Sequence, residues 1–258
     1  MGIVNNLRKR GLWAAPGHYL SPLPSRDDID RQVAWDAFGD LPGINMREPD
    51  QLSLASSLNL RLGGWDRYKP GNTMYGEPDA ALYRALLEHE SPRKVVEVGS
   101  GWSTAVALDC GLAVTSIEPF PVRMSQATRP NDRVTLVQRP VQDVPVEQLT
   151  DLAPGDILFI DSSHVAKAGS DVQWLVLNVL PCLSPGVRVH VHDIFWPFSY
   201  PEAWLREGRA WNESYLLRAL LTDSPRWRID LFAHWLWGRE PSLRLPGPWP
   251  SGLWLRRT

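Results

Sequence analysis

Two apolar, β-rich runs of the sequence end in acidic residues that stand close to histidines. Asp161 ends the strand-like part of DILFIDSSH, with His164 three residues later, and Asp193 follows His192 directly in VRVHVHDIFW. Paired carboxylates at a solvated rim suit Mg²⁺, and imidazole changes its charge near neutral pH. These residues therefore predict either a metal site at Asp161 and Asp193 or proton transfer by His164, His192 or Asp161.

The histidines also have a structural interpretation. His190 and His192 alternate along one strand and share one of its sides, and strand histidines are often buried core residues. We expect His190 in the core, leave both interpretations open for His192, and favour His164 as the proton acceptor because it lies beyond the apolar run. His18, His89 and His234 have no comparable setting.

A glycine-rich turn follows the first β-rich run, in VVEVGSGWST. Gly99 and Gly101 would let a ligand approach the backbone, and Glu118 stands 19 residues after Gly99, where an acid at the end of the next strand can bind ribose hydroxyls. The pattern predicts a nucleoside ligand, although an acid at a strand end can also serve as a helix cap. Thr104 stands where a dinucleotide-binding turn has its third glycine, which weakens the prediction of a nicotinamide-dependent oxidoreductase.

The elements around these residues alternate between strands and helices from residue 94 onward. This rhythm is typical of a doubly wound, mostly parallel α/β sheet, and the runs RWRIDLFA and SGLWLRR are expected to add an antiparallel edge, for seven strands in all. The five parallel strands are expected at 95–98, 113–117, 133–137, 156–160 and 187–191, with helices near 103–110, 121–128, 145–150, 169–182 and 212–221.

The N-terminal part has a different character. Residues 1–25 are rich in proline and glycine and are expected to form an extended arm, followed by helices starting at Ser25 and spanning about 50–62. A further helix that contains ALYRALLEHE leads into the first strand. We expect an arm and helical preface over 1–70 and the main domain over 71–258.

The chain from about residue 72 resembles class I S-adenosylmethionine-dependent methyltransferases, through EVGSGWST and the acid that ends VTSIEPF. It is similar to a bacterial subgroup that methylates small molecules and sugars, through PGIN, EPDA, IDSSHVAKAGSDVQWL, VHVHDIFWPFSYPEAW and GRAWNESYLLRALL. The resemblance implies a Rossmann-like methyltransferase fold. The residues it implies for cofactor binding are Glu97, Gly99, Ser100, Gly101, Ser103, Thr104, Glu118, Gln142, Asp143 and Asp161. For Gln142 and Asp143, a plain surface turn stays open.

The resemblance extends to the acids. In catechol O-methyltransferase and its relatives, acids at these two strand ends bind Mg²⁺, and Asp161 and Asp193 hold the matching positions. The third ligand of that family is an Asn directly after the second acid, where this chain has Ile194. Tyr75 is expected to close over the cofactor, and aromatic residues after Asp193 either wall a substrate pocket or pack against the sheet: Trp196, Phe198, Tyr200 and Trp204.

Composition limits the function classes. The 258 residues carry a net charge of −2, which gives no basic face for nucleic acid, and no run approaches the ~20 apolar residues of a spanning helix. Two cysteines in separate apolar runs support neither a disulfide framework nor a zinc site. We expect a cytoplasmic enzyme, with homodimerisation open, that moves a methyl group from S-adenosylmethionine to a hydroxyl of a sugar or glycosylated metabolite. A nicotinamide-dependent oxidoreductase and a non-catalytic nucleoside-binding protein are the alternatives.

Overall fold

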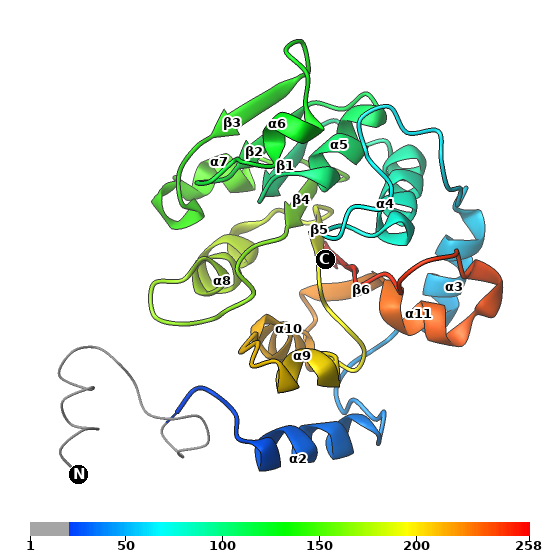
Figure 1. Cartoon of the computed structure of the whole chain (residues 1–258), viewed down its shortest axis with the longest axis vertical. Helices are drawn as coiled ribbons and strands as arrows, with labels where there is room; N and C mark the ends of the chain where they lie inside the picture. The colour runs from blue at the N-terminus through cyan, green and yellow to red at the C-terminus, as the bar shows by residue number, and fades with distance from the viewer. Residues whose placement is uncertain (1–20) are drawn as a thin grey trace.

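The computed structural model describes residues 21–258, which are built around one seven-stranded sheet of order β3-β2-β1-β4-β5-β7-β6 (Figure 1). Strands β1 to β5 are parallel, and β7 runs antiparallel to both β5 and β6. The expected doubly wound sheet with an antiparallel edge is confirmed. The strands are β1 Val95–Val98, β2 Val114–Ile117, β3 Val134–Val137, β4 Ile157–Ile160, β5 Arg188–Val191, β6 Trp227–Phe232 and β7 Leu253–Arg257.

The central strands are continuous apolar runs because both faces of the sheet are covered. Every residue of β1, β4 and β5 is buried, whereas the edge strand β3 is partly exposed. Four of the five parallel strands begin one residue later than the sequence suggested. Asp156, for example, precedes β4, because its carboxylate accepts hydrogen bonds from the backbone N–H groups of Arg93, Lys94 and Ala153 and so closes a turn.

Strand order reverses beside β1. The chain runs from β1 outward through β2 to β3, and then returns to form β4 on the other side of β1. The carboxyl ends of β1 and β4 therefore flank the position where the two halves of the sheet diverge, which is where open α/β sheets bind their ligands.

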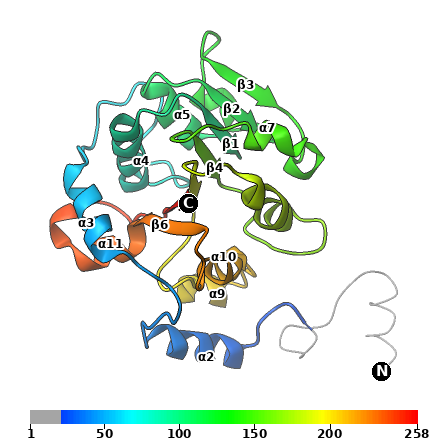
Figure 2. The same ribbon diagram turned by 180° about the vertical axis from the view of Figure 1, so that it is seen from behind.

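Helices cover the sheet in two layers (Figures 1 and 2). In one layer α4 contacts α5 and α5 contacts α6, and in the other α7 contacts the continuation of α8. These helices are α4 Glu77–Glu90, α5 Trp102–Asp109, α6 Met124–Ala127, α7 Val146–Thr150 and α8 Asp171–Trp174, which continues through Leu175–Val179 to Leu180–Cys182, and α10 Glu213–Leu221 follows later.

Two segments expected as connections contain helices. The aromatic segment after Asp193 includes α9 Glu202–Arg206, and the connection between β6 and β7 begins with α11 Ala233–Arg239. Helix α11 forms because it is anchored by packing: Leu236 and Trp237 are buried against the body of the protein. Short helices held by tertiary packing leave little periodic signal in a sequence, which is why neither of these helices was expected.

The N-terminal helices dock on the main body (Figures 1 and 2). Helix α2, Arg26–Asp36, starts at the predicted cap Ser25 and contacts α9, and α3, Glu48–Ser57, contacts β6. The side-chain oxygen of the fully buried Gln51 accepts the N–H of Phe232 at 2.7 Å. The preface helices are thus confirmed within the described residues.

The second of these helices is shorter than expected. It ends at Ser57 rather than near residue 62, because the following segment lies extended along α4. The Arg84 guanidinium holds it there by donating to the carbonyl oxygens of Arg61 and Gly63. The predicted arm lies largely outside the described residues, and the domain boundary at residue 70 stays a prediction. Within residues 21–258, no helix combines the length and apolar composition needed to cross a bilayer.

Arg188 provides a test of what holds the sheet to α4. Its buried guanidinium lies 2.5 Å from a Glu90 carboxylate oxygen and 3.6 Å from Asp230 on β6. Arg188→Leu should lower the free energy of unfolding by about 2 kcal/mol, because it removes the buried guanidinium that faces Glu90 and Asp230, although Arg256 still lies near both carboxylates. Urea denaturation measures this value.

The matched control is Arg93→Leu, which removes an exposed arginine 3.5 Å from Asp156 and should cost less than about 1 kcal/mol. If both variants lost the same free energy of unfolding, the buried ion pairs of Arg188 would contribute no more to stability than the exposed pair of Arg93.

Candidate active site

The turn after β1 packs directly against the turn after β4. A Cβ atom on Gly99 would lie 2.5 Å from the carbonyl oxygen of Asp161, and Gly99 has a φ of +105°. Any side chain at this position would push the two strand ends apart, and a residue with a Cβ also avoids this backbone conformation. The glycine is therefore required for the close approach of β1 and β4, as well as leaving backbone accessible to a ligand.

Glu97 is buried under this turn. Both of its carboxylate oxygens accept hydrogen bonds, from the hydroxyl groups of Ser103 and Thr104 in the first turn of α5. Burial raises the pKa of Glu97 to about 7, against the opposing effect of those two hydrogen bonds. The sequence suggested that Ser103 and Thr104 contact a cofactor, whereas in the structure their hydroxyl groups join α5 to β1.

A cleft of about 470 Å³ opens at the ends of β1, β2 and β4. Among the predicted cofactor residues, those that line it are Gly99, Glu118, Gln142 and Asp161. Glu118 is half-buried, and one of its oxygens accepts the N–H of Phe120 at 2.8 Å, which leaves the other free to face the cleft. The remaining predicted residues do not line this cleft: Glu97, Ser100, Gly101, Ser103, Thr104 and Asp143.

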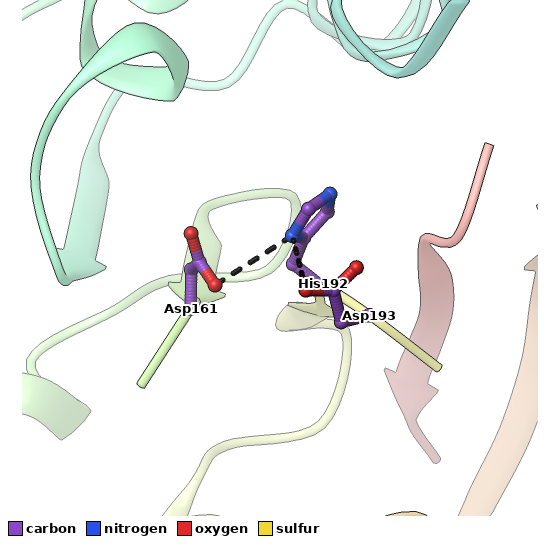
Figure 3. A group of neighbouring side chains, drawn as sticks. All are labelled: Asp161, His192 and Asp193. Atoms are coloured by element: carbon purple, nitrogen blue, oxygen red, sulfur yellow. Dashed lines mark ion pairs between the residues drawn. The ribbon is translucent and has the colours of Figure 1, made fainter. Parts of the chain in front are cut away.

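The carboxylates of Asp161 and Asp193 and the imidazole of His192, predicted at the ends of β4 and β5, lie together (Figure 3). His192 Nδ1 is 3.6 Å from Asp161 Oδ1 and 3.7 Å from Asp193 Oδ2. Each of these three residues offers one ligand atom, and the three atoms lie within 4.8 Å of one another. His192 Nδ1 is buried and has no hydrogen-bond partner, although two carboxylates face it.

His164 joins the same group from the loop after β4. Its Nε2 atom lies 3.4 Å from Asp161 Oδ1 and 3.9 Å from Asp193 Oδ2, and its Nδ1 atom lies 3.0 Å from Glu213 Oε2. Burial alone would lower the pKa of His164, but the contacts with Asp161 and Glu213 outweigh it and raise the pKa to about 10. His164 is therefore protonated at neutral pH in the ligand-free protein.

The same balance governs the neighbouring groups. Burial favours the neutral form of His192, yet Asp193 and Asp161 hold its pKa well above the ordinary value. Burial opposes ionisation of Asp161, and the two histidines nevertheless keep its pKa below the ordinary range. The group is therefore a network in which the carboxylates of Asp161 and Asp193 face the imidazoles of His164 and His192.

Three members of this network were not singled out from the sequence. Glu213 starts α10, Asp79 lies in α4, and Ser251 precedes β7. Ser251 Oγ donates to Asp193 Oδ1 at 3.0 Å, and the Ser251 N–H donates to Asp79 Oδ1 at 2.9 Å. No local spacing marks these residues, since their partners are distant in sequence.

The other predicted residues have distinct environments. His190 is buried between Phe159 and Trp254, and burial holds its pKa well below the ordinary value, which confirms it as a core residue. Tyr75 is buried with its ring centroid 4.9 Å from that of His192. In the aromatic segment Phe198 and Tyr200 are buried, whereas Trp196 and Trp204 are half-buried.

Glu97 predicts a measurable pH dependence. Its folded-state pKa of about 7 lies above the ordinary value of 4.5, so the folded protein binds more protons than the unfolded chain between these pH values. Relative to Glu97→Gln, the parent should lose about 3 kcal/mol of stability as pH rises from 4.5 to 7.5. Urea denaturation across this range measures the difference. Glu147→Gln, at an exposed position of α7, keeps Glu97 and should therefore follow the pH dependence of the parent.

Residues 96–194 match the sequence model of a family described as a methyltransferase domain. Among curated proteins, an uncharacterized protein from Archaeoglobus fulgidus is 26% identical over 162 residues, which cover 53% of this chain and 72% of that protein.

Solved structures of similar arrangement include the Podospora anserina methyltransferase PaMTH1 bound to S-adenosylhomocysteine, with 16% identity over 94% of this chain and 99% of that one and a TM-score of 0.46. An O-methyltransferase from Bacillus cereus in complex with S-adenosylhomocysteine has 16% identity over 89% of this chain and 100% of that one, with a TM-score of 0.45. The O-methyltransferase TomG from Streptomyces achromogenes, in complex with S-adenosylmethionine, has 15% identity over 90% and 99% of the two chains, with a TM-score of 0.46.

The matched segment begins in β1 and ends just after Asp193. It therefore contains the glycine turn, Glu118 and the carboxylates at the ends of β4 and β5. The match assigns residues 96–194 of this chain to a methyltransferase domain.

Proposed function

We propose that the protein transfers the methyl group of S-adenosylmethionine to a hydroxyl of a small molecule, with a sugar or glycosylated metabolite as the acceptor. The observation that carries the proposal is the group of Asp161, His192 and Asp193 beside the cleft at the ends of β1, β2 and β4. A hydroxyl must lose its proton when it is methylated to an ether. Carboxylates and imidazoles could accept that proton, and they lie where the methyl group of a donor in the cleft would be.

Within the cleft, the proposed contacts follow from what lines it. Glu118 would accept hydrogen bonds from the ribose hydroxyls, Gln142 lies where the adenine would sit, and the turn at Gly99 and Gly101 would face the methionine part. Glu97 would act beneath the turn by holding α5 through Ser103 and Thr104. Of the described residues, Asp143 has the weakest claim to a cofactor contact, because it is exposed and does not line the cleft.

The three residues Asp161, His192 and Asp193 also fit a divalent cation. Two carboxylates face the unpartnered Nδ1 atom of His192 across 3.6 and 3.7 Å, so all three can direct a ligand atom to one point. His192 would be the third ligand in place of the residue after Asp193, where Ile194 is fully buried. A cation such as Mg²⁺ would act as a Lewis acid and lower the pKa of the acceptor hydroxyl.

His164 remains the proposed proton acceptor. Glu213 holds its Nδ1 side, which directs Nε2 toward Asp161 and Asp193, where an acceptor hydroxyl would lie. The carboxylates of Asp161 and Glu213 raise the pKa of His164 to about 10, and a cation bound by Asp161 would lower it by offsetting the charge of that carboxylate. His164 can then exchange a proton near neutral pH.

The other expectations from the sequence stay predictions. A homodimer through the N-terminal helices, a cytoplasmic location and the absence of nucleic-acid and membrane partners are not addressed by the site. The match to a methyltransferase domain favours methyl transfer over the alternative of a nicotinamide-dependent oxidoreductase. A non-catalytic member of the fold would bind the cofactor and methylate no acceptor.

Cofactor binding tests the proposal first. Calorimetric titration with S-adenosylhomocysteine should show binding by the parent, and Glu118→Ala should weaken it about tenfold, because a charged acceptor of two ribose hydroxyls is lost. Asp143→Ala should change the affinity less than about twofold. Unchanged affinity in Glu118→Ala would exclude the ribose role of this residue, and no binding by the parent would contradict the proposed cofactor.

Metal binding can be measured without an acceptor. Electron paramagnetic resonance of free Mn²⁺ should show one bound ion per chain, and Asp193→Asn should weaken binding more than tenfold because a charged ligand is removed. Ser251→Ala should weaken it less, by freeing Asp193 from its hydrogen bond. Asp171→Asn is the matched control, since Asp171 lies at the cleft but contacts Ser163 instead. Equal affinity in the parent and Asp193→Asn would rule out this site.

A further inference from the structure

A second cavity, of about 530 Å³, lies beyond the carboxylates. Three indole rings dominate its lining, with an imidazole and aliphatic side chains from the preface, and its principal residues are Trp196, Trp235, Trp249, His234, Leu41 and Ile44. They come from three separate parts of the chain: the segment between α2 and α3, the segment after β5, and the connection between β6 and β7. Figures 1 and 2 show α3 and α11 side by side at this end of the sheet.

Topology places this cavity at the same edge of the sheet as the cofactor cleft. The first residue of β7, Leu253, pairs with both Val191, the last residue of β5, and Phe232, the last residue of β6. The β6–β7 connection, which carries Trp235 and Trp249, therefore leaves from the edge where β4 and β5 end. The cleft belongs to the β2-β1-β4 half of this edge, and the cavity belongs to the β5-β7-β6 half.

The carboxylates lie at the junction of the two. Trp196 follows Asp193 by three residues, and Trp249 precedes Ser251 by two. The Ser251 hydroxyl donates to Asp193 at 3.0 Å, so both segments that carry these indoles are tied to the group at the ends of β4 and β5. Asp193 and Ser251 do not line the cavity themselves, but two or three residues of chain join them to two of its indoles.

The polar groups of the cavity supply both hydrogen-bond donors and acceptors. His234 Nδ1 accepts the backbone N–H of Trp196 at 3.2 Å, and burial lowers the His234 pKa to about 4. The imidazole is therefore neutral and carries its hydrogen on Nε2, as a donor. Glu48 and Arg239 lie 3.6 Å apart and offset each other's charge, while Asp40 adds an exposed carboxylate acceptor.

We propose that this aromatic cavity, lined by Trp196, Trp235, Trp249 and His234, binds the non-reacting part of the methyl acceptor, and that this part is a hexose ring of a glycoside. A pyranose has an apolar C–H face that can cover an indole and hydroxyls that need both donors and acceptors, which the cavity supplies. The inference rests on the proposed function and specifies where and how its substrate is held.

Gly238 allows the cavity to be filled without removing a contact. It lies on α11 and lines the cavity, and a Cβ there would meet only the ring of Trp249, at 3.6 Å, which is an ordinary contact distance. Gly238→Phe should therefore occupy the cavity and leave the fold intact. Trp249→Ala removes one partly exposed indole, and Trp35→Ala removes an exposed tryptophan of α2 as the matched control.

The experiment uses saturation-transfer difference NMR on the full chain, with S-adenosylhomocysteine and Mg²⁺ present. The probes are methyl glucopyranoside, galactopyranoside and mannopyranoside, with catechol as a planar comparison. We expect ring protons of at least one hexoside to receive saturation, affinity to fall about tenfold or more in Gly238→Phe and Trp249→Ala, and no change in Trp35→Ala. Calorimetry should give S-adenosylhomocysteine affinities within about twofold of the parent in all three variants.

Three results would overturn the inference: no hexoside bound by a protein that binds S-adenosylhomocysteine, hexoside binding that persists in Gly238→Phe, or binding of catechol alone. If the parent binds a hexoside in a manner that depends on Gly238 but does not bind S-adenosylhomocysteine, the cavity assignment stands and the proposed methyl transfer falls.

Discussion

Asp161 is the residue on which the two functional parts of the molecule depend. Its carbonyl oxygen occupies the space where a side chain on Gly99 would lie, so it sets how closely the cofactor turn approaches β4. Its N–H donates to the Val98 carbonyl oxygen at 2.9 Å, and its carboxylate faces the imidazoles of both His164 and His192. A single strand end thereby couples the geometry of the cleft to that of the charged group.

Clustering these charges is costly unless each faces an opposite charge or a hydrogen-bond donor. The structure meets this requirement with residues from widely separated elements: Asp79 of α4, Glu213 of α10 and Ser251 before β7 surround the residues from β4 and β5. The neighbouring carboxylates raise the pKa values of His164 and His192 against the effect of burial, so a charge that binds beside those carboxylates changes both pKa values. Stability and chemical reactivity therefore draw on the same contacts.

The two halves of the sheet edge divide the proposed work. Parallel strands and short glycine-containing turns build the cofactor half, where backbone must come close to a ligand. The antiparallel strands β6 and β7 build the other half, where a longer connection with α11 supplies large aromatic side chains. Strands β5 and β6 end beside the first residue of β7, so the β6–β7 connection lies apart from the turns of the cofactor half. Changes in the sequence of this connection would therefore leave the cofactor half undisturbed.

The amino-acid sequence was enough to predict the mostly parallel sheet with its antiparallel edge, and to predict that acids and histidines meet where two of its strands end. Continuous apolar runs, a glycine turn and acids at strand ends are local signals, and parallel strands necessarily bring their carboxyl ends to one edge, so Asp161, His192 and Asp193 were expected near each other. Tertiary structure alone decided which groups complete the site. Glu213, Asp79 and Ser251 reach it from helices and loops far along the chain, Ser103 and Thr104 donate to Glu97, and the indoles of the aromatic cavity meet from two segments. Contacts of this kind depend on packing between elements distant in sequence, and no periodicity or spacing within one element encodes them.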